Sequence, residues 1–576
     1  MTKTLLLCSC EGTQSPDAAT LSGATGLACS RVADGLCTRE LGLVAEALKG
    51  GDTVVACAQE AERFEDLADE LGVAPPLAVD LRDRAGWSDE GPSATPKMAA
   101  LLADAMRPRP AARLMDVTSE GVCLVVGRSD VALPAAARLG DVLSVTCLLT
   151  DAGGEVPEEV GAFDVVAGGI KSATGALGGF NVRFAALREA QPGGRGARRF
   201  GPARDGGSAP CDIIVDLTGG APLFPAAHKR DGYLRADPGR PEAVATALFD
   251  AAQLVGAFEK PLYVRYEASI CAHSRAEKTA CTNCLDICPT GAITSAGEAV
   301  EIDPNICAGC GACAALCPSG AVSFDDPPVS ALFARMRGLV EAFTGAGGTA
   351  PRLLIHDAEH GAEMIRLAAR HGRGLPADVM PLDVRSLEGI GHAEVLGALG
   401  AGFLAVDLLL APRTDRTSLD REVPLAEALG AAGRLRILDV EDPDALSEAL
   451  YGADTPAPAG RSILPVGGRR EVARLAAGAL VPDAAAPLPL PEGAPYGAVL
   501  VDAGACTLCL SCSSLCPSGA LTADEDHPRL RFQEDACLQC GLCATICPES
   551  AIALQPQMNL SSSFITFCWN ASSERF

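Results

Sequence analysis

Three runs of cysteines in this chain share one spacing, C-x₂-C-x₂-C-x₃-C-P. The runs are Cys307, Cys310, Cys313 and Cys317; Cys506, Cys509, Cys512 and Cys516; and Cys537, Cys540, Cys543 and Cys547. This spacing is typical of chains that hold two four-iron clusters, in which the fourth cysteine of a run binds the neighbouring cluster. Three thiolates of one tight loop can reach three irons of a cubane, whereas the fourth lies too far round the turn. The runs therefore predict paired [4Fe–4S] clusters.

A fourth run, upstream of the others, is irregular. The proline that follows Cys288 marks this residue as a fourth ligand, and Cys284 and Cys281 take the third and second positions. Lys278 stands where the first ligand belongs, and nine residues separate Cys281 from the nearest upstream thiol, Cys271. We interpret the gap as a seven-residue insertion in the ligand loop.

The cross-pairing rule assigns these cysteines to four clusters. The predicted ligand sets are Cys271, Cys281, Cys284 and Cys317; Cys288, Cys307, Cys310 and Cys313; Cys506, Cys509, Cys512 and Cys547; and Cys516, Cys537, Cys540 and Cys543. Structural zinc is the alternative, because C-x₂-C pairs often bind it, although zinc sites seldom repeat this four-cysteine spacing in tandem. A [3Fe–4S] cluster or a labile iron is a further alternative at the irregular run.

Composition limits the cellular location of the chain and the classes of partner that it binds. The chain has 576 residues, 25 cysteines and a formal net charge of −26. Secreted chains with many cysteines are usually short and disulfide-linked, and residues 1–7 are too few for a secretory leader. No apolar run approaches the roughly 20 residues that span a bilayer. We expect a cytoplasmic protein with no membrane span, no nucleic acid and a redox partner protein with a basic patch.

Both cysteine-rich modules resemble bacterial-type 2[4Fe–4S] ferredoxin domains. The predicted fold class is therefore multidomain α/β with two ferredoxin-like (α+β) modules. Apolar spacing and composition place the boundaries. The predicted parts are an α/β domain at 1–95, a degenerate Rossmann-like α/β domain at 112–265, a first module at 266–330, an α/β domain at 350–455, a Pro/Ala-rich linker at 456–495, a second module at 496–555 and a disordered tail at 556–576. Within the second domain, we expect one long helix at Glu242–Phe258. In the tail, we expect no ligand role for Cys568.

The rest of the chain resembles the A-type component of heterodisulfide reductase fused to a hydrogenase delta-type iron–sulfur protein. The first resemblance rests on a C-x-C after the first strand, formed by Cys8 and Cys10, and on Cys37 and Cys57. It implies a fifth [4Fe–4S] cluster held by these four cysteines, with Cys29 as a substitute ligand. Buried cysteines at strand ends are the alternative.

The reductase family also has a flavin-binding Rossmann domain. Its counterpart here begins at Val125–Gly127, where the G-x-G-x-x-G fingerprint is absent. Arg128, Ser129 and Asp130 occupy the turn in which glycines let the backbone approach a pyrophosphate. FAD or NAD binding is therefore disfavoured.

Residues 350–455 resemble the delta-type protein by the order of strands and helices. That family carries cluster-binding cysteines, but this chain has none between Cys317 and Cys506. The likeness then implies a scaffold or a docking surface. A similar modular protein accompanies molybdenum formate dehydrogenases, so such an enzyme is one candidate partner.

Three histidines lie near these features. His273, in the inserted ligand loop, either adjusts a cluster through a hydrogen bond or is simply exposed. His356 and His360 are four residues apart beside acidic residues, which is a weak metal-binding pattern because the first of them ends a strand.

These observations predict an iron–sulfur electron-transfer subunit of an oxidoreductase, which relays single electrons through at least four [4Fe–4S] clusters. No nucleophile–base pair or dinucleotide loop indicates an independent enzyme, so no catalytic residue is assigned. One alternative is a flavin-dependent enzyme like heterodisulfide reductase. The other is a non-redox scaffold or assembly factor with structural clusters.

Overall fold

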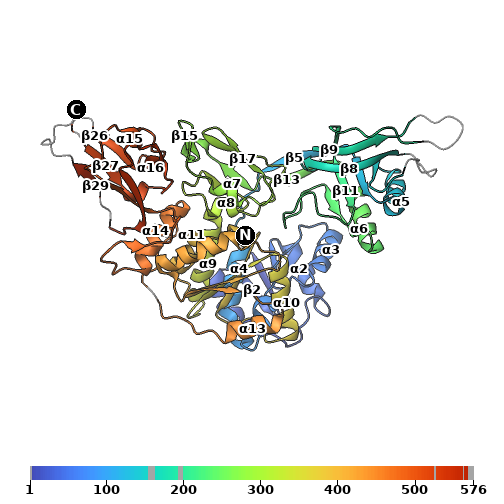
Figure 1. The fold of residues 1–576 in the computed structure, drawn as a ribbon. Coiled ribbons are helices and arrows are strands. Elements are labelled where there is room, and N and C mark those ends of the chain that lie inside the picture. The colour runs from blue at the N-terminus through green and yellow to red at the C-terminus, as the bar shows by residue number, and fades with distance from the viewer. Residues whose placement is uncertain are drawn as a thin grey trace.

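The computed structural model describes residues 3–153, 163–191, 199–458, 460–524, 527 and 529–561, and the backbone of 564–568. It has a mixed α/β, multidomain architecture (Figure 1). The first and third α/β domains form one body, and the second α/β domain and the two cysteine-rich modules lie along its upper side in this view. No helix in the described part of the chain is both long enough and apolar enough to cross a membrane.

The N-terminal domain is a parallel sheet with helices on both faces. Its strands, in the spatial order β2-β1-β3-β4, are β1 (Thr4–Cys8), β2 (Ala28–Ala33), β3 (Thr53–Val55) and β4 (Leu77–Ala78). One face packs against α1 (Ala18–Thr25) and α4 (Thr95–Ala105), and the other against α2 (Leu41–Gly50) and α3 (Ala61–Leu71). The carboxyl ends of β2, β1 and β3 therefore meet at one edge of the sheet.

The second α/β domain contains a seven-stranded sheet in the order β10-β9-β8-β7-β6-β11-β12. The strands are β6 (Val122–Gly127), β7 (Ser144–Leu149), β8 (Asp164–Thr174), β9 (Phe180–Glu189), β10 (Ser208–Cys211), β11 (Ile213–Leu217) and β12 (Tyr233–Arg235). The helices α5 (Ser129–Leu139) and α6 (Pro241–Ala252) pack on the same face. The opposite face is covered by aromatic residues, among them Phe180 and Phe224.

The long helix predicted at Glu242–Phe258 is wrong at its C-terminal end. Helix α6 stops at Ala252, and the chain turns at Gly256 (φ 123°) into β13 (Gly256–Pro261). This strand pairs with β5 (Leu114–Ser119) and forms the ribbon that leads to the first module (Figure 1). The helix ends before Gly256, whose φ is one that other residues rarely adopt; this glycine begins the strand, which finds its partner far upstream in the sequence.

The first cysteine-rich module is built from short antiparallel pairs and two single-turn helices. The pairs are β14 (Val264–Tyr266) with β19 (Val322–Phe324), β15 (Ser274–Arg275) with β16 (Lys278–Thr279), and β17 (Ile293–Ala296) with β18 (Ala299–Ile302). The helices are α7 (Asn283–Ile287) and α8 (Ala312–Ala315). The predicted insertion is thus the β15–β16 hairpin, whose turn residues Ala276 and Glu277 both have positive φ.

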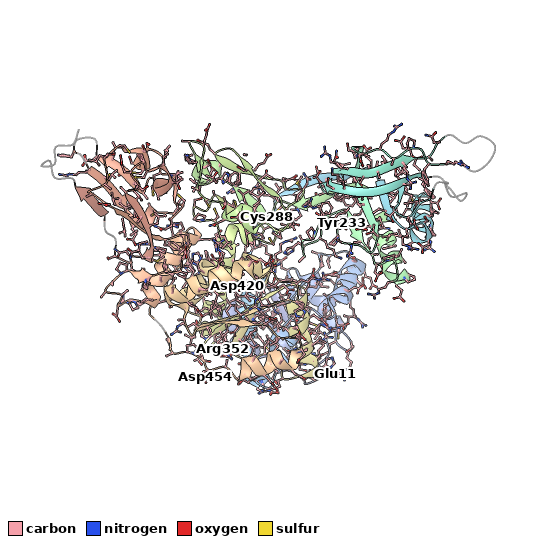
Figure 2. The ribbon with its side chains drawn as sticks, in the orientation of Figure 1. Glu11, Tyr233, Cys288, Arg352, Asp420 and Asp454 are labelled. Carbon is pink, nitrogen blue, oxygen red and sulfur yellow. The ribbon has the colours of Figure 1, made fainter. Side chains whose placement is uncertain are left out.

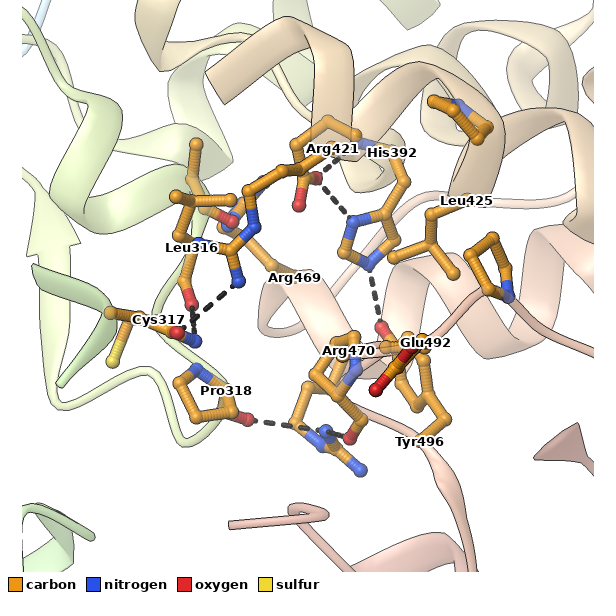
Figure 3. A pocket seen from close by; sticks show the side chains of 18 of the residues that line it. Leu316, Cys317, Pro318, His392, Arg421, Leu425, Arg469, Arg470, Glu492 and Tyr496 are labelled. Carbon is orange, nitrogen blue, oxygen red and sulfur yellow. Dashed lines mark hydrogen bonds and ion pairs between the residues drawn. The ribbon is translucent and has the colours of Figure 1, made fainter. Parts of the chain in front are cut away.

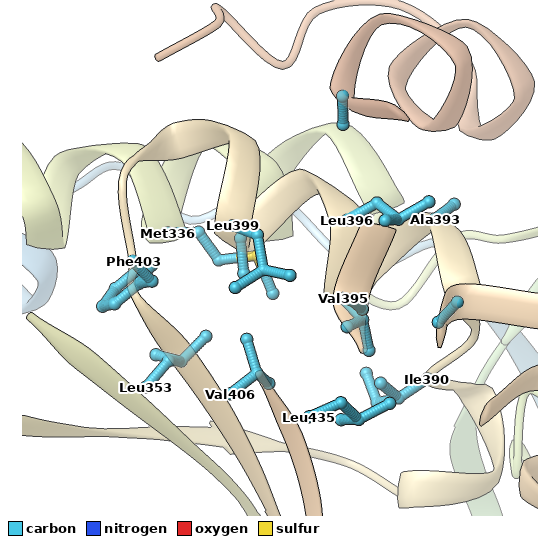
Figure 4. Close-up of a cluster of buried hydrophobic side chains, with 14 of the residues drawn as sticks. Met336, Leu353, Ile390, Ala393, Val395, Leu396, Leu399, Phe403, Val406 and Leu435 are labelled. Atoms are coloured by element: carbon cyan, nitrogen blue, oxygen red, sulfur yellow. The ribbon is translucent and has the colours of Figure 1, made fainter. Parts of the chain in front are cut away.

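The third α/β domain carries the largest core of the molecule (Figure 4). Its parallel sheet has the order β21-β20-β22-β23. The strands are β20 (Arg352–Asp357), β21 (Val379–Val384), β22 (Ala405–Leu409) and β23 (Leu435–Leu438), and the helices are α9 (Val329–Gly345), α10 (His360–His371), α11 (His392–Ala401), α12 (Thr417–Ala426) and α13 (Pro443–Tyr451). Helix α4 of the N-terminal domain packs along α9, which joins the two domains into one body.

The predicted linker at 456–495 contains a packed helix. Helix α14 (Arg469–Leu480) lies against α11, and its residues Val472, Ala473, Ala476 and Ala477 are fully buried. Their spacing gives the helix an apolar face, and Glu471 accepts a hydrogen bond from the Gly468 N–H at its first turn. The alanines of α14 therefore mark close packing, and the linker prediction is wrong for this helix.

The second cysteine-rich module repeats the plan of the first and includes part of the predicted tail. Its strands are β24 (Leu488–Pro489), β25 (Gly497–Val501), β26 (Leu521–Asp524), β27 (Arg529–Gln533) and β28 (Ile552–Met558), with helices α15 (Ser511–Ser514) and α16 (Leu542–Ile546). The tail prediction is wrong for β29 (Phe564–Cys568), which pairs with β27. The free edge of β27 supplies the backbone partners that ordered this segment. Residues 569–576 lie outside the described part.

Candidate iron–sulfur centres

Four cysteines of the first module come together around α7. Cys271 follows a 3₁₀ turn, Cys281 follows the β15–β16 hairpin, Cys284 is on α7, and Cys317 comes after α8. Burial raises the pKa of Cys284 to about 12, with the charges of Cys317, Cys281 and Cys271 as further causes. Cys284 therefore interacts with the other three cysteines of the first predicted set, and we call these four residues the Cys271 group.

The other predicted set of this module also gathers in one place. Cys313 is buried, which raises its pKa well above the usual value, and Cys310, Cys307 and Cys288 add to this increase, followed by Cys284 of the Cys271 group. We call these four residues the Cys288 group; Cys288 is labelled in Figure 2. Arg230 of the second α/β domain donates a hydrogen bond to the Thr290 carbonyl, two residues beyond Cys288.

The second module shows the same cross-pairing. Burial raises the pKa of Cys512 to about 11, and Cys506, Cys509 and Cys547 also raise it. Burial raises the pKa of Cys543 to about 12, followed by the charges of Cys537, Cys540 and Cys516. We call these sets the Cys506 group (Cys506, Cys509, Cys512 and Cys547) and the Cys540 group (Cys516, Cys537, Cys540 and Cys543). In both modules, the fourth cysteine of a run acts electrostatically on a thiol of the other run.

The ligand loops direct backbone N–H groups at the sulfurs. The Leu508 N–H lies 3.5 Å from the Cys506 Sγ, and the Ala551 N–H lies 3.3 Å from the Cys547 Sγ. In the first module, the Val322 N–H lies 3.4 Å from the Cys317 Sγ. Such contacts stabilise thiolates and the sulfurs of a bound cluster.

These contacts require residues with positive φ at matching places in each regular run. The residues are Gly309 and Gly311, Leu508 and Leu510, and Gln539 and Gly541. Three residues after each fourth cysteine, positive φ recurs at Gly291, Gly320, Gly519 and Ser550. Glycine relieves the strain at most of these positions, whereas Leu508, Leu510, Gln539 and Ser550 adopt the same conformation despite its cost. The loops therefore have one shape that is independent of their sequence.

The four groups fit a multi-iron cluster in donor type and in surroundings. Each offers four thiols, the ligands of a [4Fe–4S] cluster, and iron binding would displace their protons. No group of three or more His, Cys, Asp or Glu side chains in the described part of the chain is arranged to hold a single metal ion. That finding concerns sites for one metal ion. The assignment of the cysteines to four clusters stays a prediction.

His273 in the inserted loop is buried, contrary to the exposed alternative. Its Nδ1 lies 2.8 Å from the Cys281 carbonyl oxygen, so Nδ1 carries the proton and donates it. Its Nε2 lies 2.8 Å from the Ser295 Oγ on β17. His273 therefore holds the backbone of Cys281 in place and does not contact a sulfur.

The N-terminal cysteines form a fifth group at the edge where β1, β2 and β3 end. Burial raises the pKa of Cys37, and Glu60, Cys8 and Cys10 raise it further. Cys57 also has a raised pKa, first through burial and then through Cys37, while Arg82 opposes the increase.

The surroundings of this N-terminal group resemble those of the other groups. The Cys10 N–H lies 3.3 Å from the Cys8 Sγ, and Cys10, Glu11 and Gly12 all have positive φ. The Arg82 guanidinium lies 3.9 Å from the Cys10 Sγ and stacks on Trp87. Cys29 packs instead in the core on the opposite face of the sheet.

The expected flavin turn is occupied by a carboxylate. The central strands follow the order β8-β7-β6-β11-β12, so the crevice between β6 and β11 is the usual place for a dinucleotide. There the Ser129 N–H and hydroxyl both donate to the Asp151 Oδ1, at 2.8 and 2.6 Å. This N–H begins α5 and would have to bind the pyrophosphate. The contact supports the prediction that dinucleotide binding is disfavoured.

The pair His356 and His360 has no metal-site geometry. His356 donates from Nδ1 to the Asp357 carbonyl, and burial lowers its pKa to about 4. The Nε2 atoms of His356 and His360 are both buried without a hydrogen-bond partner.

Sequence analysis missed two arginines at the start of α14. Arg469 pairs with Glu394 and donates to the carbonyls of Ala314 and Ala315, beside the Cys271 group. Arg470 contacts both modules. The signal was an Arg-Arg pair at the head of an apolar-faced segment between the two cysteine-rich regions.

Comparison with known families agrees with the geometry of the modules. A family model described as 4Fe-4S dicluster domain matches residues 279–321 and 505–551. This match supports two ferredoxin-type modules. The second match includes all eight cysteines of its module, whereas the first begins after Cys271, where the insertion departs from the family pattern.

The rest of the chain has no such match. No curated protein matches the chain. The resemblance to heterodisulfide reductase and the delta-type protein therefore receives no support from the comparisons. The two dicluster domains support an iron–sulfur electron-transfer role.

Proposed function

We propose that this protein relays single electrons through four [4Fe–4S] clusters, two in each module. The observation that supports the proposal is electrostatic: Cys317, Cys288, Cys547 and Cys516 each act on a thiol of the run that is not their own. A cluster, when bound, supplies the one-electron chemistry. The chain holds it with thiolates, directs N–H groups at the sulfurs and shields it from water.

We further propose a fifth cluster at Cys8, Cys10, Cys37 and Cys57. The proposal rests on the convergence of the four thiols, on the Cys10 N–H contact with Cys8 and on the positive φ of Cys10, Glu11 and Gly12. Arg82 would place a positive charge beside this cluster, which favours its reduced, more negative form.

The electron partner is proposed to be a protein with a basic docking surface, as one component of a larger oxidoreductase complex. The net charge of −26 supports such a partner, because opposite charges steer association. A molybdenum formate dehydrogenase is one candidate on the resemblance described above. The flavin-dependent alternative is weakened by the Asp151 contact with Ser129.

The test is the iron, sulfide and zinc content of anaerobically purified protein. About 16 iron per chain with equal sulfide supports four clusters, and about 20 supports five. Reversible reduction, followed by electron paramagnetic resonance (EPR), then separates an electron carrier from a structural scaffold. Zinc in place of iron, or clusters that cannot be reduced and reoxidised, would contradict the proposal.

A further inference from the structure

The inserted hairpin of the first module contacts the second module. Strand β16 packs against α16, which begins directly after Cys540 and Gly541 (Figure 1). The hairpin is also the segment that leads into Cys281. A departure from the family's ligand spacing is therefore also the place where the modules meet.

Each side of this contact carries a predicted ligand. Cys281 comes two residues after β16, and Cys540 comes two residues before α16. The loops of the Cys271 and Cys540 groups therefore meet at this contact, although the groups belong to different modules.

Arg470 of α14 binds a ligand loop of each module. One terminal nitrogen, Nη1, donates to the carbonyls of Pro318 (3.1 Å) and Pro495 (2.7 Å) (Figure 3). The other, Nη2, donates to the carbonyls of Asp535 (3.2 Å) and Cys537 (2.8 Å). Pro318 directly follows Cys317 of the Cys271 group, and Cys537 belongs to the Cys540 group.

The surroundings of Arg470 keep it in place. Its guanidinium stacks on Tyr496, with 4.5 Å to the ring centroid. Tyr496 in turn bonds through its hydroxyl to His392, which pairs with Glu422. These residues line a cavity of about 200 Å³ between the first module, the third α/β domain and residues 491–496, next to Cys317 and Pro318 (Figure 3). Four carbonyl contacts from one half-buried side chain fix the distance between the two loops.

We propose that the two modules form one continuous electron path, joined between the Cys271 group and the Cys540 group, and that Arg470 and the Ser274–Thr279 hairpin are the positioning elements of this junction. The inference rests on the proposed function. Along the proposed path, the order is the Cys288 group, the Cys271 group, the Cys540 group and the Cys506 group. At the junction, one electron leaves a reduced cluster, which is oxidised, and reduces the facing cluster; no bond forms or breaks.

The first test needs no variant at Arg470. In full-length protein, the second module is emptied by Cys506→Ser with Cys537→Ser, and in a second protein the first module is emptied by Cys281→Ser with Cys307→Ser. If the modules are joined, the EPR spectrum of fully reduced wild type differs from the sum of the two variant spectra, because facing reduced clusters couple magnetically. A wild-type spectrum equal to the sum would overturn the junction.

The second test compares Arg470→Ala with Arg474→Ala, one turn further along α14. Arg474 donates to the Asn559 carbonyl and contacts neither ligand loop of the junction. We expect both variants to keep their full iron, whereas only Arg470→Ala weakens the EPR coupling and slows electron redistribution between the modules at least tenfold after rapid reduction. Equal behaviour of the two variants at full iron content would refute the role of Arg470. Low iron in wild type would instead contradict the proposed function.

Discussion

Cys29 and Cys37 lie in one small domain, but the sheet separates them. Cys37 shares a core with Cys8 and Cys57, whereas Cys29 packs in the core on the opposite face. The sequence alone left Cys29 as a substitute ligand, because spacing does not tell which face a residue on β2 occupies. The register of β1 against β2 determines the face: Cys8 lies opposite Ala33, and Cys29 lies opposite Leu5, which points to the other face.

This separation gives a matched pair of variants for the fifth cluster. We expect Cys37→Ser to lower the iron content by about four per chain, since loss of one thiolate from a four-ligand set destabilises the cluster. Cys29→Ser should leave the iron content unchanged. Iron and sulfide analysis of both proteins checks this, and equal iron in Cys37→Ser and wild type would contradict a fifth cluster.

Arg275 allows a prediction about redox potential. Its charge acts on Cys540, so it should stabilise the reduced form of the cluster in the Cys540 group. Arg275→Gln should lower the midpoint potential of that cluster by a few tens of millivolts, or about 0.5–1 kcal/mol. Lys278→Gln, in the same hairpin, is the control, because Lys278 is exposed. A redox titration followed by EPR measures both; equal shifts would point to net charge and not to the position of Arg275.

At the scale of helices and strands, the most accurate predictions concern elements whose structure is determined by their own residues. Strands β7 (Ser144–Leu149) and β11 (Ile213–Leu217) each coincide with a short apolar run between turns, which apolar spacing alone marks as a strand. The ligand loops were predictable for a similar reason, since cluster chemistry fixes the cysteine spacing.

Elements that depend on distant partners were the ones missed. Helix α14 was assigned to a linker because its small residues resemble linker composition, and only α11 explains their burial. Strand β29 needs the edge of β27, and β13 needs β5, which lies far upstream. Arg470 could not be recognised as a junction residue before α14 was known to lie between the modules.

Helix α4, at a predicted domain boundary, carries a buried lysine. Lys97 donates from Nζ to the carbonyls of Leu375 (3.1 Å) and Pro376 (2.7 Å) of the third α/β domain. Burial lowers its pKa from 10.5 to about 7, against the opposing charges of Asp378 and Glu90. Between these two values, the unfolded chain binds a proton that the folded chain does not. The free energy of unfolding should therefore rise with pH in this range, and the cost of burying the charged form is fully present below pH 7.

The measurement is denaturant unfolding at about pH 7, 8 and 9 under anaerobic conditions. Lys97 should contribute a slope of at most about 1.4 kcal/mol per pH unit. Lys97→Met should remove this slope, whereas Lys49→Met, at an exposed position of α2, should keep it. Parallel pH profiles for Lys97→Met and wild type would show that Lys97 is not the group responsible.

At the scale of the whole molecule, the proposed path has two unlike ends. Cys509 is the one exposed thiol among the sixteen predicted ligands of the modules, and hydrogen bonding with Ser511 lowers its pKa. At the other end, Cys313 is buried and Arg230 of the second α/β domain covers the Thr290 carbonyl. The Cys506 group is therefore the end where electrons exchange most readily with a partner in solution.

The charge at this exposed end should determine how fast it exchanges electrons with charged redox reagents. Glu549 is exposed, and its charge raises the pKa of Cys506. Glu549→Lys should slow oxidation by a cationic complex such as hexaammineruthenium several-fold at low ionic strength, and salt should diminish the difference, because it screens exposed charges. Glu62→Lys, on α3 of the N-terminal domain, changes the net charge equally and should have little effect. Stopped-flow rates for the two variants separate the cases: equal slowing would mean that the overall charge governs encounter, whereas slowing in Glu549→Lys alone would mark the Cys506 group as the exchanging end of the path.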